Sequence, residues 1–260
     1  MNTDKKISIA IVGSGNVGTH LFRAFEQNRI FVQQIVSSSV PHSSGSSFPS
    51  ECKIISQPQD IDKQTDLVIL AVPDDLLNAD FLSGFDKNLF LVHTSGSVEM
   101  SVFADFNNYG VFYPLQTFSK KRELDYSAIP FCIEANTAEN ETFLFNLASK
   151  ISLDVRLINS QQRRQIHLAA VFACNFSNYL FHISETLLRE KNLDFGILWP
   201  LLKETIEKVH DAPAREMQTG PAIRNDLITI QKHLDLLAQH PDFQEIYTLI
   251  SKNISNVNKV

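Results

Sequence analysis

The stretch that most constrains the fold is SIAIVGSGNVGTHLFRAF, residues 8–25. An apolar run over Ile7–Val12 is followed at once by three glycines in the spacing GxGxxG, and then by a pattern typical of an amphipathic helix over Asn16–Gln27. A strand, a glycine turn and a helix in that order begin a βαβ unit. This beginning predicts a parallel sheet with a ligand site at the turn.

The first 158 residues continue the pattern, because short apolar runs alternate with helical segments. The runs LVILAV and LFLVH are apolar on consecutive residues, as expected for strands that are covered on both faces. The strands that we expect after Ile7–Val12 are Ile30–Val36, Lys53–Ile55, Leu67–Val72, Leu89–His93, Gly110–Tyr113, Phe131–Glu134 and Val155–Ile158. Strands and helices that alternate in this way predict a doubly wound, mostly parallel α/β sheet.

After Ile158 the strand signals nearly stop. Ser160 is positioned to cap a long helix that runs to about Lys191, and further helices are expected over Phe195–Val209, Ile223–Ala238 and Asp242–Ile254. We therefore expect two domains: a Rossmann dinucleotide-binding domain over 1–158, and an all-helical domain for substrate binding and dimerisation over 159–260.

Charge and composition exclude several classes of partner. The net charge is −6 and no block is rich in Lys or Arg, which argues against a nucleic-acid or membrane surface. The N-terminal apolar run is too short for a signal peptide or a membrane span. The three cysteines are scattered and form no CxxC pair, so we expect a reducing, cytoplasmic environment and no metal site.

The glycine loop in this context predicts that a dinucleotide binds at the turn. Gly13 would allow the tight turn, Gly15 would let the backbone approach a pyrophosphate, and Gly18 would let the helix and strand pack closely. The pyrophosphate would lie at the helix N-terminus, where N–H groups and the positive end of the dipole favour an anion. The residues that we expect to hold it are Gly13, Ser14, Gly15, Asn16 and Val17.

The end of the second predicted strand favours NADP(H) over NAD(H). NAD sites usually carry an acidic residue about twenty positions after the glycines, but here the strand ends in Ser37-Ser38-Ser39 and no carboxylate follows until Glu51. The hydroxyls of Ser37 and Ser38 can donate to a 2′-phosphate on the adenosine ribose. The alternative is that these serines belong to a flexible, solvated loop.

Two further strand ends should border the same site, because ligands of doubly wound sheets lie beyond the carboxyl ends of the strands. Ala71, Val72 and Pro73 follow the strand LVIL and should border the cofactor. Thr94 begins the segment TSG after the next strand, which would line the nicotinamide or substrate side. An ordinary turn with a helix cap explains this segment equally well.

The long predicted helix carries a polar stripe. At 100° per residue, one arc of about 80° contains His167, Asn175, Asn178, His182 and Glu185. Imidazole exchanges protons near neutral pH, so His167 is the candidate acid, and Asn175 would orient a substrate. The alternative is a solvated stripe or a set of satisfied core histidines.

Arg224, in the segment TGPAIRND, has two possible roles. It would clamp a substrate carboxylate through bidentate hydrogen bonds, or it would pair with Asp226 at the start of a helix.

The motifs GSGNVGTHL, DLVILAVPDDLL, HTSGSV, FYPLQTFS, IPFCIE, HLAAVFACN and TGPAIRND occur in this order. The series resembles the Rossmann-like NADP oxidoreductases that carry a C-terminal domain of unknown function numbered 2520. It is more distantly similar to pyrroline-5-carboxylate reductase, prephenate dehydrogenase and the 6-phosphogluconate dehydrogenase superfamily.

The resemblance implies that the helical domain forms a homodimer and that the active site lies between the domains. It also implies that His167 and Asn175 match the family's helix motif. Tyr113 and Gln116 match its cleft segment, and Arg224 matches the position after TGP. Val171 stands where the wider superfamily's hydroxyacid dehydrogenases carry a lysine, which weighs against a lysine-based alcohol oxidation.

Together these features predict an NADP-dependent oxidoreductase. It would transfer hydride between the nicotinamide and a small carbonyl, imine or hydroxy substrate. The alternative is a protein that binds NADP(H) without catalysis and acts as a sensor or interaction partner.

Overall fold

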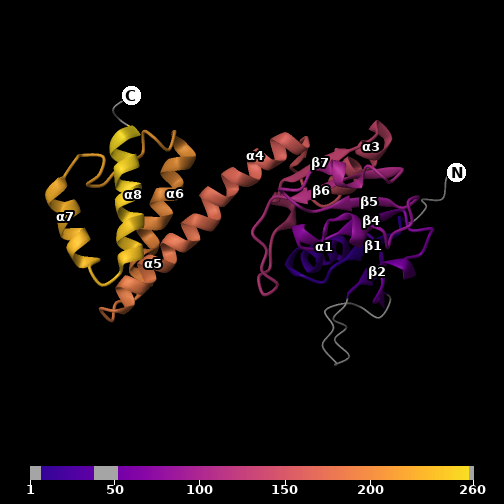
Figure 1. The fold of residues 1–260 in the computed structure, drawn as a ribbon, viewed down its shortest axis with the longest axis horizontal. Helices are drawn as coiled ribbons and strands as arrows, with labels where there is room; N and C mark the ends of the chain where they lie inside the picture. The colour runs from indigo at the N-terminus through magenta and orange to yellow at the C-terminus, as the bar shows by residue number, and fades with distance from the viewer. Residues whose placement is uncertain (1–6, 38–51, 258–260) are drawn as a thin grey trace. The chain divides into compact units, whose positions relative to one another are not determined.

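The computed structural model describes residues 7–37 and 52–257 of the 260-residue chain. Contacts between residues divide the chain into two compact units, Met1–Cys174 and Asn175–Val260. The division falls later than the boundary that we predict at 158/159, just after the last strand. The strands belong to the first unit, and the second unit is helical (Figure 1).

The first unit is built around one eight-stranded sheet of order β3-β2-β1-β4-β5-β6-β7-β8. Neighbouring strands are parallel except β6 and β7, which pair antiparallel. The strands are β1 (Ile9–Val12), β2 (Val32–Val36), β3 (Lys53–Ile55), β4 (Leu67–Leu70), β5 (Phe90–His93), β6 (Asn108–Pro114), β7 (Phe131–Ala135) and β8 (Val155–Leu157). The predicted doubly wound, mostly parallel sheet is confirmed, and each predicted strand is present.

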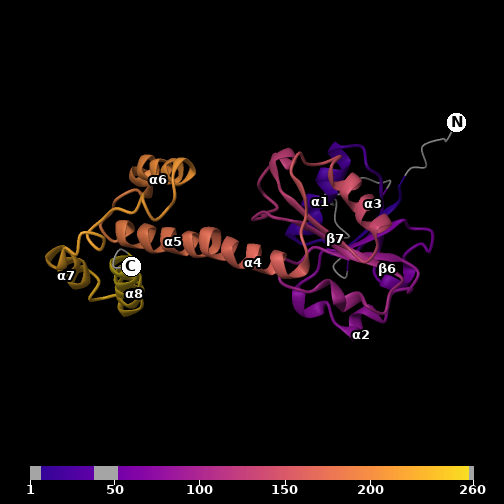
Figure 2. The same ribbon diagram turned by 90° about the horizontal axis from the view of Figure 1, so that it is seen from above.

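Helices cover both faces of this sheet (Figure 2). Alternate residues of each central strand point to opposite faces. In β1, Ile9 and Ile11 pack with α1 (Asn16–Gln27) and α3 (Ala138–Ala148). Ala10 and Val12 pack instead with α2 (Ala79–Leu82), the loop after it and the 3₁₀ turn η3 (Met100–Phe103). The central strands are therefore buried on both sides, which explains their continuous apolar runs.

The long helix predicted from Ser160 is present, but it differs from the prediction at two points. It consists of α4 (Ser160–Ala170), a π-helical stretch over Val171–Phe176 and α5 (Ser177–Arg189). Its cap is Asn159, whose side chain accepts from the Gln162 N–H at 2.9 Å, while the Gln162 side chain accepts from the Asn159 N–H at 3.1 Å. The prediction that Ser160 is the cap is wrong.

The π-helical stretch also changes the helix faces. Its i→i+5 bonding places about one extra residue in the turn, which rotates the following side chains by about 100° relative to a regular α-helix. The arc predicted for His167, Asn175, Asn178, His182 and Glu185 assumes a regular helix throughout, and this assumption is wrong.

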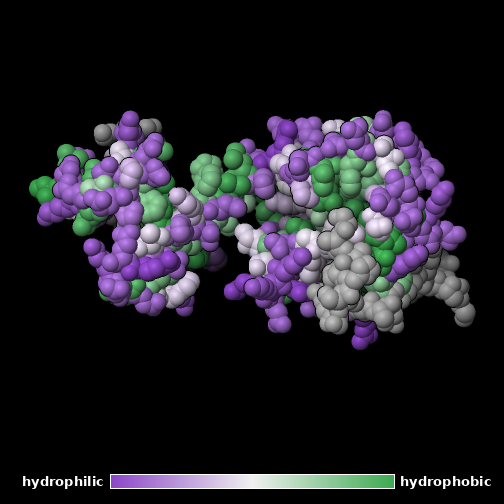
Figure 3. All heavy atoms as spheres, turned by 60° about the horizontal axis from the view of Figure 1, so that its bottom comes forward, coloured by the Kyte–Doolittle hydropathy of each residue, from purple (hydrophilic) through white to green (hydrophobic). Residues whose placement is uncertain are grey.

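The second unit is helical and has little buried core. Besides α5 it contains the 3₁₀ turn η6 (Phe195–Leu198), α6 (Trp199–Asp211), α7 (Leu227–Leu236) and α8 (Pro241–Val257). Among its described hydrophobic side chains only Ala222 and Leu237 are buried. Trp199 is 62% exposed and Ile228 is 73% exposed, and apolar side chains lie on its surface in Figure 3.

One helix of the described chain, Ser160–Arg189, is long and apolar enough to cross a membrane by length and composition. Its most apolar window has a mean hydropathy of 1.2, and none of that window is buried. A single helix of this kind is weak evidence for a membrane span, because helices of soluble proteins that pack against other proteins have the same composition.

Candidate functional site

The loop between β1 and α1 places the glycines at the carboxyl edge of the sheet. The Gly13 N–H donates to the Val36 carbonyl at 2.9 Å, so the loop is tied to the end of β2. Gly15 is the N-cap of α1 and offers no side chain to the first-turn N–H groups. These N–H groups have no acceptor inside the helix, so they and the helix dipole form a site suited to an anion.

Each glycine of this loop has a different reason to be glycine. Gly13 has φ +106°, which side chains rarely allow. A Cβ on Gly18 would collide with the Gly13 carbonyl oxygen. At Gly15 the backbone is unstrained and a Cβ would meet no protein atom within 4 Å. The fold therefore requires Gly13 and Gly18, whereas the space in front of Gly15 is left open for a ligand.

A cavity of about 580 Å³ opens in front of this loop. That volume suits a cofactor-sized ligand. Its lining comes from the glycine loop, the ends of β2, β3 and β4, and the region of α2: Val12, Gly13, Ser14, Gly15, Val36, Ser37, Ser56, Gln57, Pro58, Gln59, Ala71, Val72, Pro73, Leu76, Asp80, Phe81, Ser83 and Gly84.

Seven of the predicted cofactor residues line this cavity: Gly13, Ser14, Gly15, Ser37, Ala71, Val72 and Pro73. Asn16 and Val17 form the first turn of α1 beside it. Thr94 does not line it; it follows β5, and its N–H donates to the Leu70 carbonyl at 3.2 Å. Ser38 lies outside the described residues.

The end of β2 is held next to the glycine loop by a hydroxyl pair. The Ser14 and Ser37 hydroxyls lie 2.8 Å apart, and the Ser37 N–H donates to the Ile55 carbonyl at 3.0 Å. Ser37 is buried, so its hydroxyl is part of the wall of the cavity. Within the described ranges 7–37 and 52–257, the lining contains one carboxylate, Asp80, and neither Lys nor Arg.

The ends of β4 and β5 are joined beyond the sheet. The Ser97 hydroxyl donates a hydrogen bond to the Asp74 carboxylate. The Ser95 hydroxyl accepts from the N–H groups of Ser97 and Val98 at 3.1 and 3.0 Å, so Ser95 caps the turn. The loop after β5 is thereby fixed to the loop that borders the cavity.

His167 and Tyr113 meet over this same loop. The Tyr113 hydroxyl lies 3.2 Å from Nδ1 of His167, and the rings are in an edge-to-face arrangement with centroids 6.2 Å apart. A Cβ on Gly96 would lie 2.5 Å from His167 Nδ1 and 2.9 Å from Tyr113 Cζ. Gly96 therefore allows the two rings to pack against the loop backbone. Burial raises the pKa of Tyr113 to about 12, so its hydroxyl keeps its proton at neutral pH.

A buried ion pair anchors the helix that carries His167. Arg163 is fully buried one turn before His167, and its guanidinium donates to Glu134 of β7 at 2.7 Å. It also donates to the Val98 carbonyl of the loop after β5, and to the Ser160 hydroxyl at 3.1 Å. Arg163 therefore ties α4 both to the sheet and to the loop that contacts His167.

His93, the last residue of β5, is a second buried histidine near the site. Its Nδ1 accepts from the Ser95 N–H at 3.2 Å, and its Nε2 has no hydrogen-bond partner in the described part of the chain. Burial first, and then the positive charge of Arg163, lower the pKa of His93 to about 3. His93 is therefore neutral at physiological pH and supports the loop structurally.

The structure thus unites two predicted site residues, His167 and Tyr113, in one cluster. Gln116 lies just beyond β6, is exposed, and accepts from the Thr117 N–H at 2.7 Å. Asn175 lies in the π-helical stretch and is exposed.

The predicted pair between Arg224 and Asp226 is not formed as an ion pair, although both residues are among those that the structure describes. Asp226 instead caps α7 by accepting from the N–H and hydroxyl of Thr229 at 3.0 and 2.7 Å. Arg224 is exposed. Asn175 and Arg224 both belong to the second unit, and their roles remain predictions.

The residues that hold the cluster together are Arg163, Glu134, Ser97 and Asp74, and none of them is among the predicted site residues. Arg163 stands four residues before His167, so helical spacing alone places both on one face. Glu134 ends the quoted motif IPFCIE, and Asp74 directly follows Pro73 in DLVILAVPDDLL. The sequence does not reveal which of these residues are hydrogen-bonded. Arg163 and Glu134 are 29 positions apart, and Ser97 and Asp74 are 23 positions apart.

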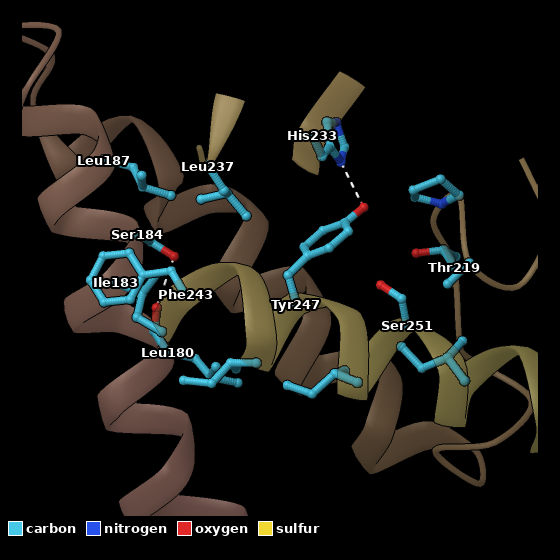
Figure 4. A pocket seen from close by; sticks show the side chains of 15 residues that line it. Leu180, Ile183, Ser184, Leu187, Thr219, His233, Leu237, Phe243, Tyr247 and Ser251 are labelled. Carbon is cyan, nitrogen blue, oxygen red and sulfur yellow. Dashed lines mark hydrogen bonds between the residues drawn. The ribbon is translucent and has the colours of Figure 1, made fainter. Parts of the chain in front are cut away.

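A second hollow, of about 370 Å³, lies within the helical unit and is mainly apolar (Figure 4). Side chains of α5, α7 and α8 line it, among them Leu180, Leu187 and Phe243. In it the Tyr247 hydroxyl lies 2.8 Å from Nδ1 of His233. In residues 7–37 and 52–257 no group of three or more His, Cys, Asp or Glu side chains is arranged to hold a metal ion.

Comparison with known proteins adds two family matches. Residues 2–117 match the Rossmann-like domain, and residues 129–254 match the domain of unknown function DUF2520. No curated protein matches the chain.

Solved structures resemble the chain over nearly its whole length. The putative NADP oxidoreductase of Bacteroides fragilis is 36% identical, with a TM-score of 0.88 and coverage of 96% of this chain and 98% of that one. A reductive aminase of Aspergillus terreus, in complex with NADPH and ethyl-5-oxohexanoate, shares the fold at 11% identity, with a TM-score of 0.72 and coverage of 98% and 94%. A Plasmodium falciparum pyrroline carboxylate reductase with NADP bound shares it at 14% identity, with a TM-score of 0.55 and coverage of 96% and 98%. The chain belongs to the family whose members join a Rossmann-like domain to the domain of unknown function DUF2520.

Proposed function

We propose that the protein is an NADP-dependent oxidoreductase that transfers hydride between the nicotinamide and a small carbonyl, imine or hydroxy compound. One observation carries the proposal. The cavity at the glycine loop reaches the loop after β4, the His167–Tyr113 pair packs on the loop after β5, and the hydrogen bond from Ser97 to Asp74 joins these two loops. A cofactor site and a proton-handling group at one edge of a parallel sheet are the parts that this chemistry needs.

The cavity fits a dinucleotide. Gly15 leaves open space where a pyrophosphate would approach the N–H groups of Asn16 and Val17. Ala71, Val72 and Pro73 would border the cofactor from the end of β4.

We prefer NADP(H) because Ser37, and not a carboxylate that would repel a 2′-phosphate, directly follows β2. The similar Bacteroides protein is described as an NADP oxidoreductase, and the aminase and carboxylate reductase structures contain NADPH and NADP.

The protein's own residues would position the substrate and handle the proton. When bound, the nicotinamide supplies or accepts the hydride. His167 is the residue that we assign to the electronegative atom of the substrate, as a proton or hydrogen-bond donor. We propose substrate contacts for Tyr113, Gln116 and Arg224, and an orienting role for Asn175, as the family resemblance implies.

We also propose that the protein is a cytoplasmic homodimer whose helical units pair. The support is the second unit, which has 86 residues but only two buried described hydrophobic side chains. A unit of this size needs a larger apolar core to be stable, and pairing of two identical copies is the commonest way to cover such a surface.

The proposed pairing can be measured by light scattering on the size-fractionated protein. We expect Ile228→Glu to shift the mass from dimer towards monomer, and Lys232→Glu on the same helix to leave the dimer intact. A monomeric wild-type protein would refute the dimer.

The test of the proposed function begins with cofactor binding. The protein is titrated with NADPH and with NADH by nicotinamide fluorescence, and NADPH oxidation is then followed with cyclic imines and small ketones. Tight NADPH binding with turnover that falls in His167→Gln supports the proposal. Tight binding without turnover for any substrate supports a non-catalytic sensor, and no binding of either nucleotide refutes both.

A further inference from the structure

We infer that Tyr113 is a positioning residue that holds His167 in one neutral tautomer, with Nδ1 accepting a hydrogen bond and Nε2–H presented as the donor. Only the catalytic role of this tautomer rests on the proposed function. The tautomer itself follows from the hydrogen-bond partners of the two side chains.

The hydrogen-bond donors and acceptors of Tyr113 and His167 favour one tautomer. The Tyr113 hydroxyl has one partner among the described residues of the first unit, His167 Nδ1 at 3.2 Å. Tyr113 is 9% exposed, so an O–H without an acceptor there would carry a desolvation cost. If Nδ1 carried the proton, it would donate to the phenol oxygen, and the phenol O–H would be left without an acceptor. If Nδ1 is unprotonated, the O–H donates to it and both groups are satisfied. The second arrangement is therefore favoured.

The imidazole ring of His167 cannot easily flip by rotation about its Cβ–Cγ bond. Nδ1 and Cγ of His167 lie so near Gly96 that a Cβ there would be 2.5 and 2.7 Å from them. Arg163 fixes the helix one turn earlier through Glu134 and the Val98 carbonyl. A rotated ring would replace Nδ1 by a carbon atom opposite Tyr113 and lose the hydrogen bond. The packing and the hydrogen bond thus select the same orientation.

This tautomer leaves Nε2–H of His167 as a hydrogen-bond donor. With Nδ1 occupied by Tyr113, Nε2–H is the remaining polar group of His167, and it has no hydrogen-bond partner in the described first unit. A neutral imidazole that donates one hydrogen bond can polarise a C=O or C=N bond without giving up its proton, as in triosephosphate isomerase. Tyr113 would thus make His167 a fixed hydrogen-bond donor to the substrate, and the phenol need not touch the reacting atoms.

The test is the protonation of the two ring nitrogens, read by long-range ¹H–¹⁵N correlation spectra of protein labelled at histidine. His167→Gln identifies the His167 signals. In the wild type at pH 8 we expect Nδ1 to be unprotonated and Nε2 to be protonated. In Tyr113→Phe we expect the share of the Nδ1–H tautomer to rise several-fold. Tyr109→Phe is the matched control, since it removes a hydroxyl from the same strand and should leave His167 unchanged.

Two results would overturn the inference: an Nδ1–H tautomer in the wild type, or a His167 spectrum that Tyr113→Phe does not change. Neither depends on cofactor or substrate, so failure here is separate from failure of the proposed function. If NADPH turnover is found, we further expect Tyr113→Phe to lower kcat about tenfold and to leave the Kd for NADPH within about twofold of the wild type. A cofactor Kd that changes as much as kcat would indicate a structural role instead.

Discussion

Replacing Gly15 by alanine tests directly whether the glycine loop serves a ligand. A Cβ at this position meets no protein atom within 4 Å, and φ is −70°. The substitution should stabilise the protein by about 0.4–1 kcal/mol by restricting the unfolded chain. It should also cost roughly 0.5–1 kcal/mol, because alanine is a poorer N-cap than glycine. The two effects nearly cancel, so we expect the Tm to change by less than about 2 °C.

Binding should respond very differently. The added methyl group would occupy the space in front of the first turn of α1, where the N–H groups are directed. A phosphate held by these groups would lose at least one charge-assisted hydrogen bond, worth about 1.5–3 kcal/mol. The Kd for NADPH should therefore rise about 10- to 150-fold.

Gly18→Ala is the matched comparison within the same motif. Its Cβ would collide with the Gly13 carbonyl oxygen and lie 3.5 Å from the Ala71 Cβ. Overpacking of this kind costs about 1–3 kcal/mol, which lowers the Tm by about 2–12 °C.

Thermal unfolding and nicotinamide fluorescence, measured on all three proteins, separate the two roles. If Gly15→Ala binds NADPH as tightly as the wild type, the loop does not hold the pyrophosphate. If Gly15→Ala is as unstable as Gly18→Ala, the fold rather than a ligand explains Gly15.

Three further predictions concern the residues that support the site. Arg163→Met should lower the free energy of unfolding by about 3–5 kcal/mol, because the Glu134 carboxylate loses its charged partner and keeps only the Ser160 hydroxyl; adding Glu134→Gln should recover part of this loss in urea unfolding, and no recovery would contradict the pairing. His93 has its pKa lowered from 6.5 to about 3 in the folded protein, so the unfolded chain binds a proton that the folded chain does not. As the pH drops from 6.5 to about 3, the free energy of unfolding should therefore fall by about 1.4 kcal/mol per pH unit. His93→Asn should reduce this slope by the same amount. Ser97→Ala removes the hydrogen bond to Asp74 and should cost about 0.5–1.5 kcal/mol in the same assay, whereas an unchanged stability would show that the two strand ends are not joined.

Most of the first unit could be predicted from the sequence, since its central strands are buried on both faces. Burial on both faces makes a strand apolar at every position, and β4 with Leu67–Leu70 is an example. The helix α1 was predictable to the residue because glycine marks its start and the apolar face repeats with the helical period. These are local signals, and they can be recognised in the sequence without knowledge of the tertiary structure.

What could not be predicted depends on contacts between distant residues. Asn159 and Ser160 are both good helix caps. Only the structure shows that Asn159 is the cap, and that the Ser160 hydroxyl donates instead to the Glu134 carboxylate at 2.7 Å. The π-helical stretch Val171–Phe176 has no Pro or Gly to indicate a break in the helix. The pairing of Tyr113 with His167 joins residues 54 positions apart, so the sequence identifies both as candidates without bringing them together.

The candidate site that the structure describes lies within the first unit. The cavity at Gly15, the loop held by Asp74 and the His167–Tyr113 pair all belong to the first unit, and hydrogen bonds within that unit connect them. A cofactor and a hydrogen-bond donor can therefore be positioned by the first unit alone. The remaining predicted residues, Asn175 and Arg224, belong to the second unit, so their substitution should alter which substrates react while leaving the affinity for NADPH unchanged. A loss of NADPH affinity in Arg224→Ala would show that the second unit takes part in holding the cofactor and that this division of roles is wrong.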